Sequence, residues 1–224
     1  MAEQALAGIK VIEVTQWVAA PAAGALLADW GAEVIHIEHP VRGDAMRGLS
    51  NVGGMGMDWL FELDNRNKKS VTLDISKKEG QTVLHRLLGK ADVFITSLRP
   101  SELERYNLEY PVLSRLNPRL IFASLTGYGR KGPEREKRGY DVTAFWAQSG
   151  FMASLREPDR PPIFPRGGMG DHTTSIAMAC GITTALFARE RTGVGQEVDV
   201  SLYNIGVWVL SVDMSCALAT GEYP

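Results

Sequence analysis

The residue best placed to do chemistry is Asp171, which follows a glycine-rich run over 166–170 and opens a helical pattern. One interpretation is structural, because aspartate is a favoured helix N-cap and glycines commonly form the turn before it. The other is functional: the glycines expose the side chain and let backbone N–H groups approach a bound group, while the helix N-terminus favours an ionised carboxylate. Such a carboxylate can act as a covalent nucleophile.

A second candidate is the basic segment 130–138, which holds five cations in nine positions. It follows a predicted strand and a Gly-Tyr-Gly turn, and open α/β sheets bind ligands outside the carboxyl ends of their strands. The segment is either a solvated loop or a source of cations for phosphate or a nucleotide-like anion. Arg99 and Arg105, which follow the strand ending at Thr96, are expected at the same edge.

Other chemistry-bearing residues carry weaker signals. The glycines of 53–56 lack a preceding strand and a Gly-Lys-Ser/Thr ending, so we interpret them as a flexible loop. No pair among the four histidines has metal-ligand spacing, and no metal site is predicted. Cys180 and Cys216 lie in apolar, helix-like stretches, and we expect reduced, buried thiols rather than a disulfide.

Short β-rich runs alternate with helical patterns along the chain, which predicts an α/β fold with a largely parallel sheet. One domain is expected over 1–200, followed by a helix over 201–224. The proline- and glycine-rich stretch 156–170 is interpreted as a surface loop. The predicted strands are 8–14, 32–38, 70–75, 92–96, 120–125 and 196–200, and the predicted helical segments are 22–30, 77–88, 101–106, 112–116, 140–150, 175–190 and 202–218.

Composition excludes several classes of protein. The chain has 224 residues, 45% of them hydrophobic and 22% charged, with a formal net charge of -2. These values are those of an ordinary globular protein and argue against a disordered tail, a collagen-like chain or a disulfide scaffold. Charge is evenly mixed, so neither nucleic acid nor a membrane is an expected partner. No signal peptide or membrane-length apolar run is evident, and we expect a cytoplasmic location.

Motifs across nearly the whole chain resemble those of the class III CoA-transferases, the CaiB/BaiF family. The resemblance implies a Rossmann-like large domain with a mostly parallel sheet, and a second, smaller domain that is missing or incomplete here. It also implies that the chain is the N-terminal part of a longer protein or one subunit of a split enzyme. The matching motifs lie at 6–13, 21–22, 27–38, 43–44, 67–74, 91–93, 117–121, 127–129 and 191–200.

The resemblance implies that CoA passes from an acyl-CoA donor to a carboxylic acid acceptor, with Asp171 of the Gly170–Asp171 pair as the nucleophile. Mixed-anhydride and aspartyl-CoA thioester intermediates are expected, and each tetrahedral intermediate needs N–H donors, for which the amides of Gly167, Gly168 and Gly170 are candidates. CoA enters as a substrate, and no permanently bound cofactor is expected.

The family's CoA contacts carry over position by position. Arginines suit the CoA phosphates, while aromatic residues suit the adenine and pantetheine. His39 stands where formyl-CoA transferase has arginine, and Val18 replaces the active-site glutamine of that enzyme, which argues against formyl or oxalyl substrates. The resulting positions are Trp17, Val18, Ala19, His39, Leu73, Asp74, Ile75, Ser76, Ser97, Leu98, Arg99, Arg105, Arg138, Tyr140 and Asp141.

Two alternatives remain. The related α-methylacyl-CoA racemases carry histidine at the position of Tyr140 as an acid/base group, and a tyrosine with an ordinary pKa of about 10 suits that role poorly. The chain could instead be a non-catalytic CoA-binding subunit completed by another chain. Family members form interlocked dimers, so a homodimer or heteromer is expected for a completed chain.

Overall fold

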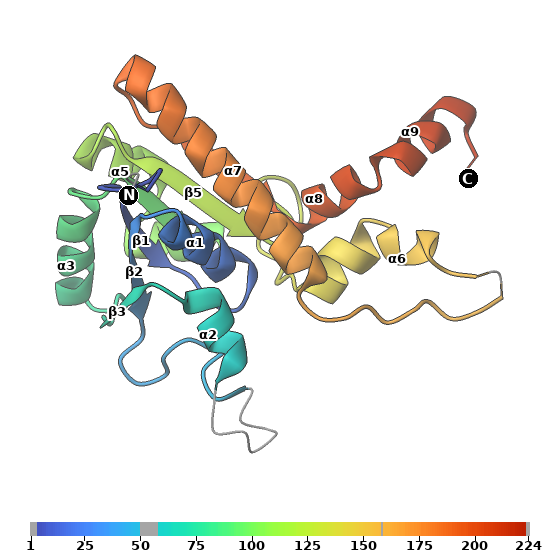
Figure 1. The fold of residues 1–224 in the computed structure, drawn as a ribbon, viewed down its shortest axis with the longest axis horizontal. Coiled ribbons are helices and arrows are strands. Elements are labelled where there is room, and N and C mark those ends of the chain that lie inside the picture. The colour runs from blue at the N-terminus through green and yellow to red at the C-terminus, as the bar shows by residue number, and fades with distance from the viewer. Residues whose placement is uncertain (1–3, 50–57, 158, 223–224) are drawn as a thin grey trace.

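The computed structural model describes residues 4–49, 58–157 and 159–222, so the glycine run over 53–56 lies outside the described residues. Its centre is a six-stranded sheet in which every neighbouring pair is parallel, in the order β3-β2-β1-β4-β5-β6 (Figure 1). This is the strand order of doubly wound Rossmann folds. The strands are β1 (Lys10–Val14), β2 (Glu33–Glu38), β3 (Lys69–Thr72), β4 (Val93–Thr96), β5 (Ile121–Thr126) and β6 (Glu197–Ser201).

Helices connect the strands and cover the sheet. They are α1 (Ala19–Asp29), α2 (Trp59–Asn65), α3 (Lys78–Leu88), α4 (Pro100–Tyr106), α5 (Tyr110–Leu116), η2 (Asp141–Gln148), α6 (Phe151–Ser154), α7 (Met169–Thr192), α8 (Leu202–Val209) and α9 (Ser211–Thr220). The predicted α/β class and parallel sheet are therefore confirmed.

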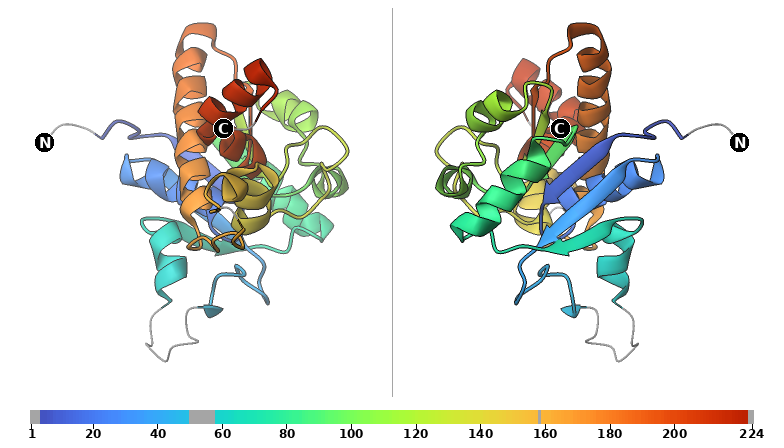
Figure 2. Two further views of the ribbon diagram at one scale, coloured as in Figure 1. Left: turned by 90° about the vertical axis from the view of Figure 1, so that its right-hand side faces the viewer. Right: turned by 90° about the vertical axis from the view of Figure 1, so that its left-hand side faces the viewer.

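Alternation along each strand divides the core into two layers. Val11 of β1 faces a cluster shared with α1 and α7, whereas the next residue, Ile12, faces a cluster shared with α3, α4 and α5. Figure 2 shows α7 and α3 on different sides of the sheet. The central strands β4 and β5 are buried throughout, as expected for parallel strands covered on both faces.

The strand order reverses between β1 and β4, which are neighbours although they are distant in sequence. Connections from these two strands leave in opposite directions, and the crevice between them is where such sheets bind ligands. The segments that follow β1, β2, β4 and β5 all open at this edge, so the fold places the predicted site there.

Several elements of the structure differ from the prediction. Helix α2 was not predicted, since its seven residues border the glycine-rich loop. The predicted helix over 140–150 is a π-helix, η2, followed by the short α6. The predicted helix over 202–218 is two helices, α8 and α9, and α7 begins at Met169, six residues before the predicted start at Ser175.

Among the described residues, no single helix is both long and apolar enough to cross a membrane. Helices α8 and α9 together pass the length and composition criteria, although the chain bends by 71° between them. The prediction of buried cysteines is wrong. Cys180 and Cys216 are free and exposed, because they lie on faces of α7 and α9 that no other described element covers. Figure 1 shows α9 projecting away from the sheet.

Candidate active site

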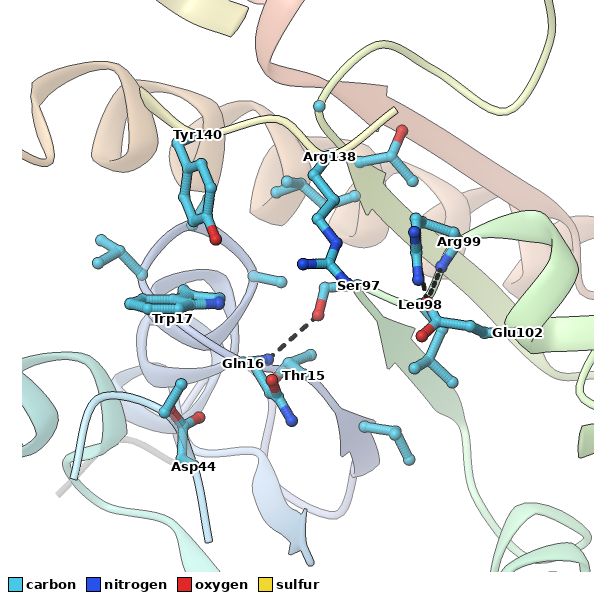
Figure 3. Close-up of a pocket in the computed structure, with 18 of the residues that line it drawn as sticks. Thr15, Gln16, Trp17, Asp44, Ser97, Leu98, Arg99, Glu102, Arg138 and Tyr140 are labelled. Carbon is cyan, nitrogen blue, oxygen red and sulfur yellow. Dashed lines mark hydrogen bonds and ion pairs between the residues drawn. The ribbon is translucent and has the colours of Figure 1, made fainter. Parts of the chain in front are cut away.

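A cavity of about 770 Å³ opens at the carboxyl edge of the sheet. Of the positions carried over for CoA, the catalytic aspartate and its loop, all line this cavity except Arg105 and Gly170. Figure 3 shows residues of four separate segments converging on it. The predicted residues that line the cavity are Trp17, Val18, Ala19, His39, Leu73, Asp74, Ile75, Ser76, Ser97, Leu98, Arg99, Arg138, Tyr140, Asp141, Gly167, Gly168 and Asp171.

Asp171 lies in the first turn of α7 and does not cap it. The N-cap is Gly168, whose φ of 83° is left-handed, and no side chain of α7 itself caps the helix. The capping acceptor comes from another element: the Asp141 Oδ2 of η2 accepts the Gly168 N–H at 2.7 Å. The structural interpretation of Asp171 as an N-cap is therefore wrong, and its half-buried carboxylate faces the cavity instead.

Gly170 lets α7 approach η2 closely. A β-carbon at this position would stand 2.3 Å from Asp141 Oδ1 and 2.3 Å from Phe145 Cγ. Any side chain here would push apart the two elements that carry Asp141 and Asp171. The glycine before the aspartate is thus a packing requirement, and its position behind the cavity wall explains why it does not line the cavity.

Two neighbouring carboxylates determine the charge of the site. Burial, and then the charge of Asp141, raise the pKa of Asp171 to about 7, although His172 opposes the shift. Burial also raises the pKa of Asp141, against the opposing N–H groups of Gly168, Gly170 and Asp171. The predicted effect of the helix N-terminus, a strongly ionised Asp171, is outweighed by burial and by the second carboxylate.

Trp17 and Tyr140 form an aromatic pair beside this carboxylate cluster. Their rings meet edge to face with centroids 5.5 Å apart, and Figure 3 shows the two side chains next to each other at one side of the cavity. Trp17 has a φ of 71°, a left-handed conformation that is unusual for a residue with a β-carbon. The adjacent Val18 brings its Cγ1 to 4.0 Å from the β-carbon position of Gly168, which places the pair next to the loop of Asp171.

The cations of the cavity come from three segments. Arg99 is paired with Glu102 at 3.0 Å, and Figure 3 shows Arg138 extending into the cavity from the loop between β5 and η2. Arg105 is exposed and lies over the ring of its neighbour Tyr106, with 5.6 Å between the guanidinium carbon and the ring centroid. Arg105 was predicted to contact CoA but does not line the cavity, because α4 carries it away from the cavity wall.

The basic segment divides between the cavity and the surface. Lys137 and Arg138 line the cavity, whereas Arg130 pairs with Glu197 and lies over the ring of Phe122. The exposed Lys131 and Arg135 fit the solvated-loop interpretation, whereas Arg130 is only 17% exposed and fits neither interpretation. The ligand-facing interpretation fits the end of the segment.

Sequence reasoning missed Arg42, a cation that lines the cavity. His39 Nδ1 accepts the N–H groups of Val41 and Arg42 at 3.1 and 3.2 Å, which forms the turn that carries Arg42 to the cavity. The signal was present, since Arg42 follows the end of β2 by four residues, and strand ends gather at one edge.

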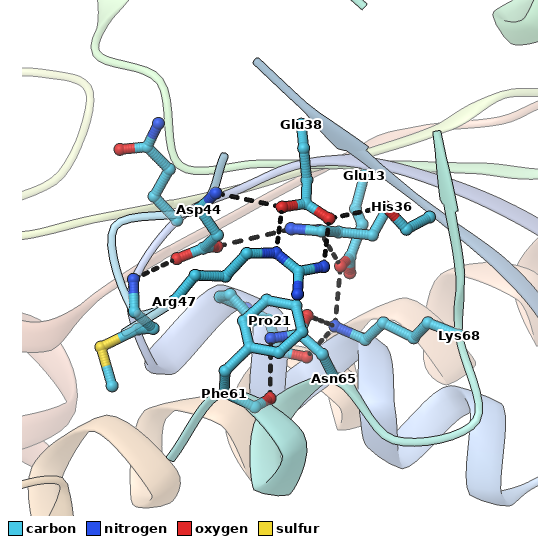
Figure 4. A network of polar contacts seen from close by, with 12 residues as sticks. Glu13, Pro21, His36, Glu38, Asp44, Arg47, Phe61, Asn65 and Lys68 are labelled. Atoms are coloured by element: carbon cyan, nitrogen blue, oxygen red, sulfur yellow. Dashed lines mark hydrogen bonds and ion pairs between the residues drawn. The ribbon is translucent and has the colours of Figure 1, made fainter. Parts of the chain in front are cut away.

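Sequence reasoning also missed a buried ionic network beneath the cavity (Figure 4). Glu13 Oε1 accepts hydrogen bonds from Lys68 Nζ at 2.7 Å and pairs with His36 Nδ1 at 2.6 Å, and all three side chains are almost completely buried. Burial alone would lower the pKa of His36, but hydrogen bonds to Asp44 and Glu13 outweigh it and raise the pKa to about 9.

The same network joins the strands to the helices. Lys68 also donates to the Pro21 carbonyl of α1 and to Asn65 of α2, at 2.7 and 2.9 Å. Alongside it, the Glu38 carboxylate accepts two hydrogen bonds from the Arg47 guanidinium, from Nε at 2.6 Å and from Nη2 at 2.7 Å. The network therefore fixes the ends of β1 and β2, on which the cavity is built.

The fold and cavity place the molecule among Rossmann-like α/β proteins whose ligand site lies at the switch point of the sheet. Comparison with known proteins narrows this class, because the model of CoA-transferase family III matches residues 6–224. The chain belongs to CoA-transferase family III.

Known relatives agree with this assignment. The chain is 38% identical over 223 residues to (R)-2-hydroxy-4-methylpentanoate CoA-transferase of Clostridioides difficile, a match that covers 98% of this chain and 56% of the relative. It is 38% identical to cinnamoyl-CoA:phenyllactate CoA-transferase of Clostridium sporogenes, covering 94% and 52%. The crystal structure of a CaiB/BaiF family protein from Brucella suis matches with a TM-score of 0.92 at 35% identity, covering 100% of this chain and 60% of that protein. The chain thus spans just over half the length of these relatives.

Proposed function

We propose that the chain binds an acyl-CoA in the cavity and transfers CoA to a carboxylic acid through covalent intermediates on Asp171. The observation that carries this proposal is the position of Asp171: a half-buried carboxylate at the cavity wall, not engaged as a helix cap, with a pKa of about 7. A carboxylate whose pKa lies near neutral pH can both attack a thioester and leave from an anhydride.

The proposed reaction has four balanced steps. An Asp171 carboxylate oxygen attacks the thioester carbonyl carbon, the C–S bond breaks, and a mixed anhydride and CoA thiolate result. The thiolate attacks Asp171 Cγ, giving an aspartyl-CoA thioester and releasing the donor acid as a carboxylate. The acceptor carboxylate attacks Cγ to form a second anhydride and expel the thiolate, which then attacks the acceptor's carbonyl. The new acyl-CoA leaves, and the Asp171 carboxylate is regenerated.

Of the three glycine amides predicted as oxyanion donors, one fits the geometry of the loop best. The Gly168 N–H is already donated to Asp141, and Gly170 does not line the cavity. Gly167 is the glycine of the loop that both lines the cavity and retains this candidate role. We therefore assign charge stabilisation to the Gly167 amide and to the field of the α7 N-terminus, with Gly168 and Gly170 serving the loop's shape.

We propose that the cavity's cations bind the CoA phosphates and its aromatic pair contacts the pantetheine or acyl end. Arg42, Arg99 and Arg138 line the cavity from three separate segments, and charge-assisted contacts from arginine suit phosphate. Trp17 and Tyr140 lie next to the loop of Asp171 and offer apolar surface where the reacting carbonyl must lie.

The acceptor is proposed to be an acid with an apolar side chain. Val18, Val142 and Leu202 line the cavity together with the aromatic pair, and neither a formyl nor an oxalyl group would use that surface. The relatives named for 2-hydroxy-4-methylpentanoate and phenyllactate, which carry branched or aromatic side chains, support the same class. A panel of CoA esters against carboxylic acids, read by mass spectrometry, tests it: preference for small dicarboxylic acids would contradict the proposal.

We further propose that the active form is an interlocked dimer or a heteromer. Trp208, Val212 and Leu218 on α8 and α9 are 73%, 79% and 86% exposed, and Trp208 and Leu218 line one shallow groove together with Val207 and Met214. Sedimentation velocity tests this: a monomer with full transferase activity would contradict it.

A further inference from the structure

His172 and Asp64 form a pair beside Asp171 that the proposed steps do not use. The Nε2 atom of His172 lies 3.0 Å from Asp64 Oδ1. The Asp64 side chain is only 3% exposed, whereas that of His172 is 44% exposed. A buried carboxylate at the end of α2 thus holds a half-exposed imidazole on the first turn of α7.

The position of the imidazole depends on the glycine turn. Side chains on a helix lean towards its N-terminus, so His172 reaches back over the residue four positions earlier. Its Cε1 and Nδ1 atoms lie 3.6 and 3.7 Å from where a β-carbon of Gly168 would stand. The same Gly168 donates its N–H to Asp141, so the imidazole and the Asp141 carboxylate both contact this turn.

Three carboxylates act on one another around the first turn of α7. Burial raises the pKa of Asp171 most, Asp141 of η2 and Asp64 of α2 raise it further, and His172 of its own helix lowers it. The hydrogen bond to Asp64 raises the pKa of His172, against the effect of burial, and Asp171 and Asp141 add to the increase. The facing residues of the β1–α1 segment, Trp17 to Ala19, carry no charge.

We propose that His172, held by Asp64 at the turn where Asp141 already places a negative charge, keeps the half-buried Asp171 carboxylate available in its ionised form, because its cation offsets the negative charges of Asp64 and Asp141. His172 is therefore a positioning residue that acts through Asp171, and Asp64 fixes its orientation. The consequence for CoA transfer rests on the proposed function, since an ionised Asp171 is the species that attacks the thioester.

The charge balance predicts how variants behave. His172→Gln removes the cation and leaves Asp64 as an additional negative charge, so Asp171 should titrate at a higher pH. An upward shift of about half a unit to one unit corresponds to a three- to tenfold smaller ionised fraction below the midpoint. In Asp64→Asn/His172→Gln both charges are gone, so most of the shift should be reversed.

The test is a titration of Asp171 by ¹³C NMR in the full 224-residue chain labelled at aspartate Cγ. The Asp171 resonance is assigned by its loss in Asp171→Asn. The midpoint is compared among wild type, His172→Gln and the double variant, and His85→Gln serves as a matched control, because His85 lies on α3 and contacts the Asn107 carbonyl instead. Circular dichroism establishes that each variant is folded.

An upward shift in His172→Gln that is reversed in the double variant supports the proposal. An unchanged midpoint in folded His172→Gln overturns it. An equal shift in both variants also overturns it, because the shift would then not depend on the charge of Asp64. Because the titration needs no CoA turnover, its result is independent of whether Asp171 forms a covalent intermediate. If the predicted shift is found but no CoA adduct forms on Asp171 after incubation with an acyl-CoA, the proposed function alone is refuted.

Discussion

The raised pKa of Asp171 means that the carboxylate destabilises the fold at neutral and higher pH. The folded chain binds a proton on Asp171 up to about pH 7, whereas the unfolded chain loses it near the ordinary value of 3.8. Between these values the folded state binds more protons, so this residue makes the free energy of unfolding fall as pH rises. Asp171→Asn, which cannot ionise, should lack this fall.

The magnitude follows from the shift. One pKa unit corresponds to about 1.4 kcal/mol, so a shift from 3.8 to about 7 sets a ceiling of about 4 kcal/mol. Because the side chain is only half buried and keeps some contact with water, we expect Asp171→Asn to raise the free energy of unfolding by about 2 to 3 kcal/mol above pH 7. Near pH 4, where the folded wild type is protonated, the two proteins should be equally stable.

Urea unfolding followed by circular dichroism at pH values from 4 to 8 measures this difference. Carboxylates that do not interact with Asp171 titrate equally in both proteins and cancel, whereas Asp141, Asp64 and His172 are coupled to it and contribute to the measured difference. Asp159→Asn, in an exposed loop, is the matched control for removing one surface carboxylate. A difference between wild type and Asp171→Asn that does not grow with pH would refute the reasoning, because it would mean that burial and Asp141 do not raise the pKa.

Three further outcomes are expected. Arg138→Gln should weaken CoA binding about three- to tenfold in low salt and less in high salt, as measured by calorimetry. Arg105→Gln is the control, because Arg105 lies outside the cavity. Equal losses of affinity in the two variants would contradict the assignment of Arg138 to the CoA phosphates. Lys68→Met should lower the free energy of unfolding by about 3 kcal/mol, since it leaves a buried carboxylate short of a partner; Lys69→Met, whose ion pair is exposed, should change little, and similar losses would refute the network's role. Trp17→Gly should relieve the backbone strain of the left-handed conformation and keep the free energy of unfolding within about 1 kcal/mol of wild type. The KM for acyl-CoA should rise severalfold. An unchanged KM would mean that Trp17 does not contact the substrate.

The sheet could be predicted from sequence because its signals are local. Strands such as β4 and β5 are short, mostly apolar runs, and helices such as α3 carry one apolar stripe. Helix α2 and the bend between α8 and α9 could not be predicted, because the first borders a glycine-rich loop and the second interrupts a largely apolar pattern. The cysteines show the same limit, since an apolar helix does not reveal which of its faces is covered.

Most of the residues that line the cavity could be predicted from the sequence, but its electrostatics could not. The glycine run and motif order predicted Asp171, and strand ends predicted Arg99 and Arg138, all of which line the cavity. The role of Asp141 as the acceptor for the α7 N-terminus depends on a contact across 27 residues, and no local pattern contains it. The same holds for Glu13 and Lys68, which are 55 residues apart in the chain and meet only in the folded protein.

The most direct test of the account is a mass measurement on the intact protein after incubation with an acyl-CoA. The account predicts a CoA adduct that maps to Asp171, is released by hydroxylamine and is missing from Asp171→Asn, together with loss of CoA transfer and nearly intact CoA binding in that variant. An adduct on another residue, or transfer at a near-normal rate by Asp171→Asn, would contradict the claim that Asp171 is the nucleophile. Proton exchange next to the thioester without any adduct would indicate racemase chemistry instead.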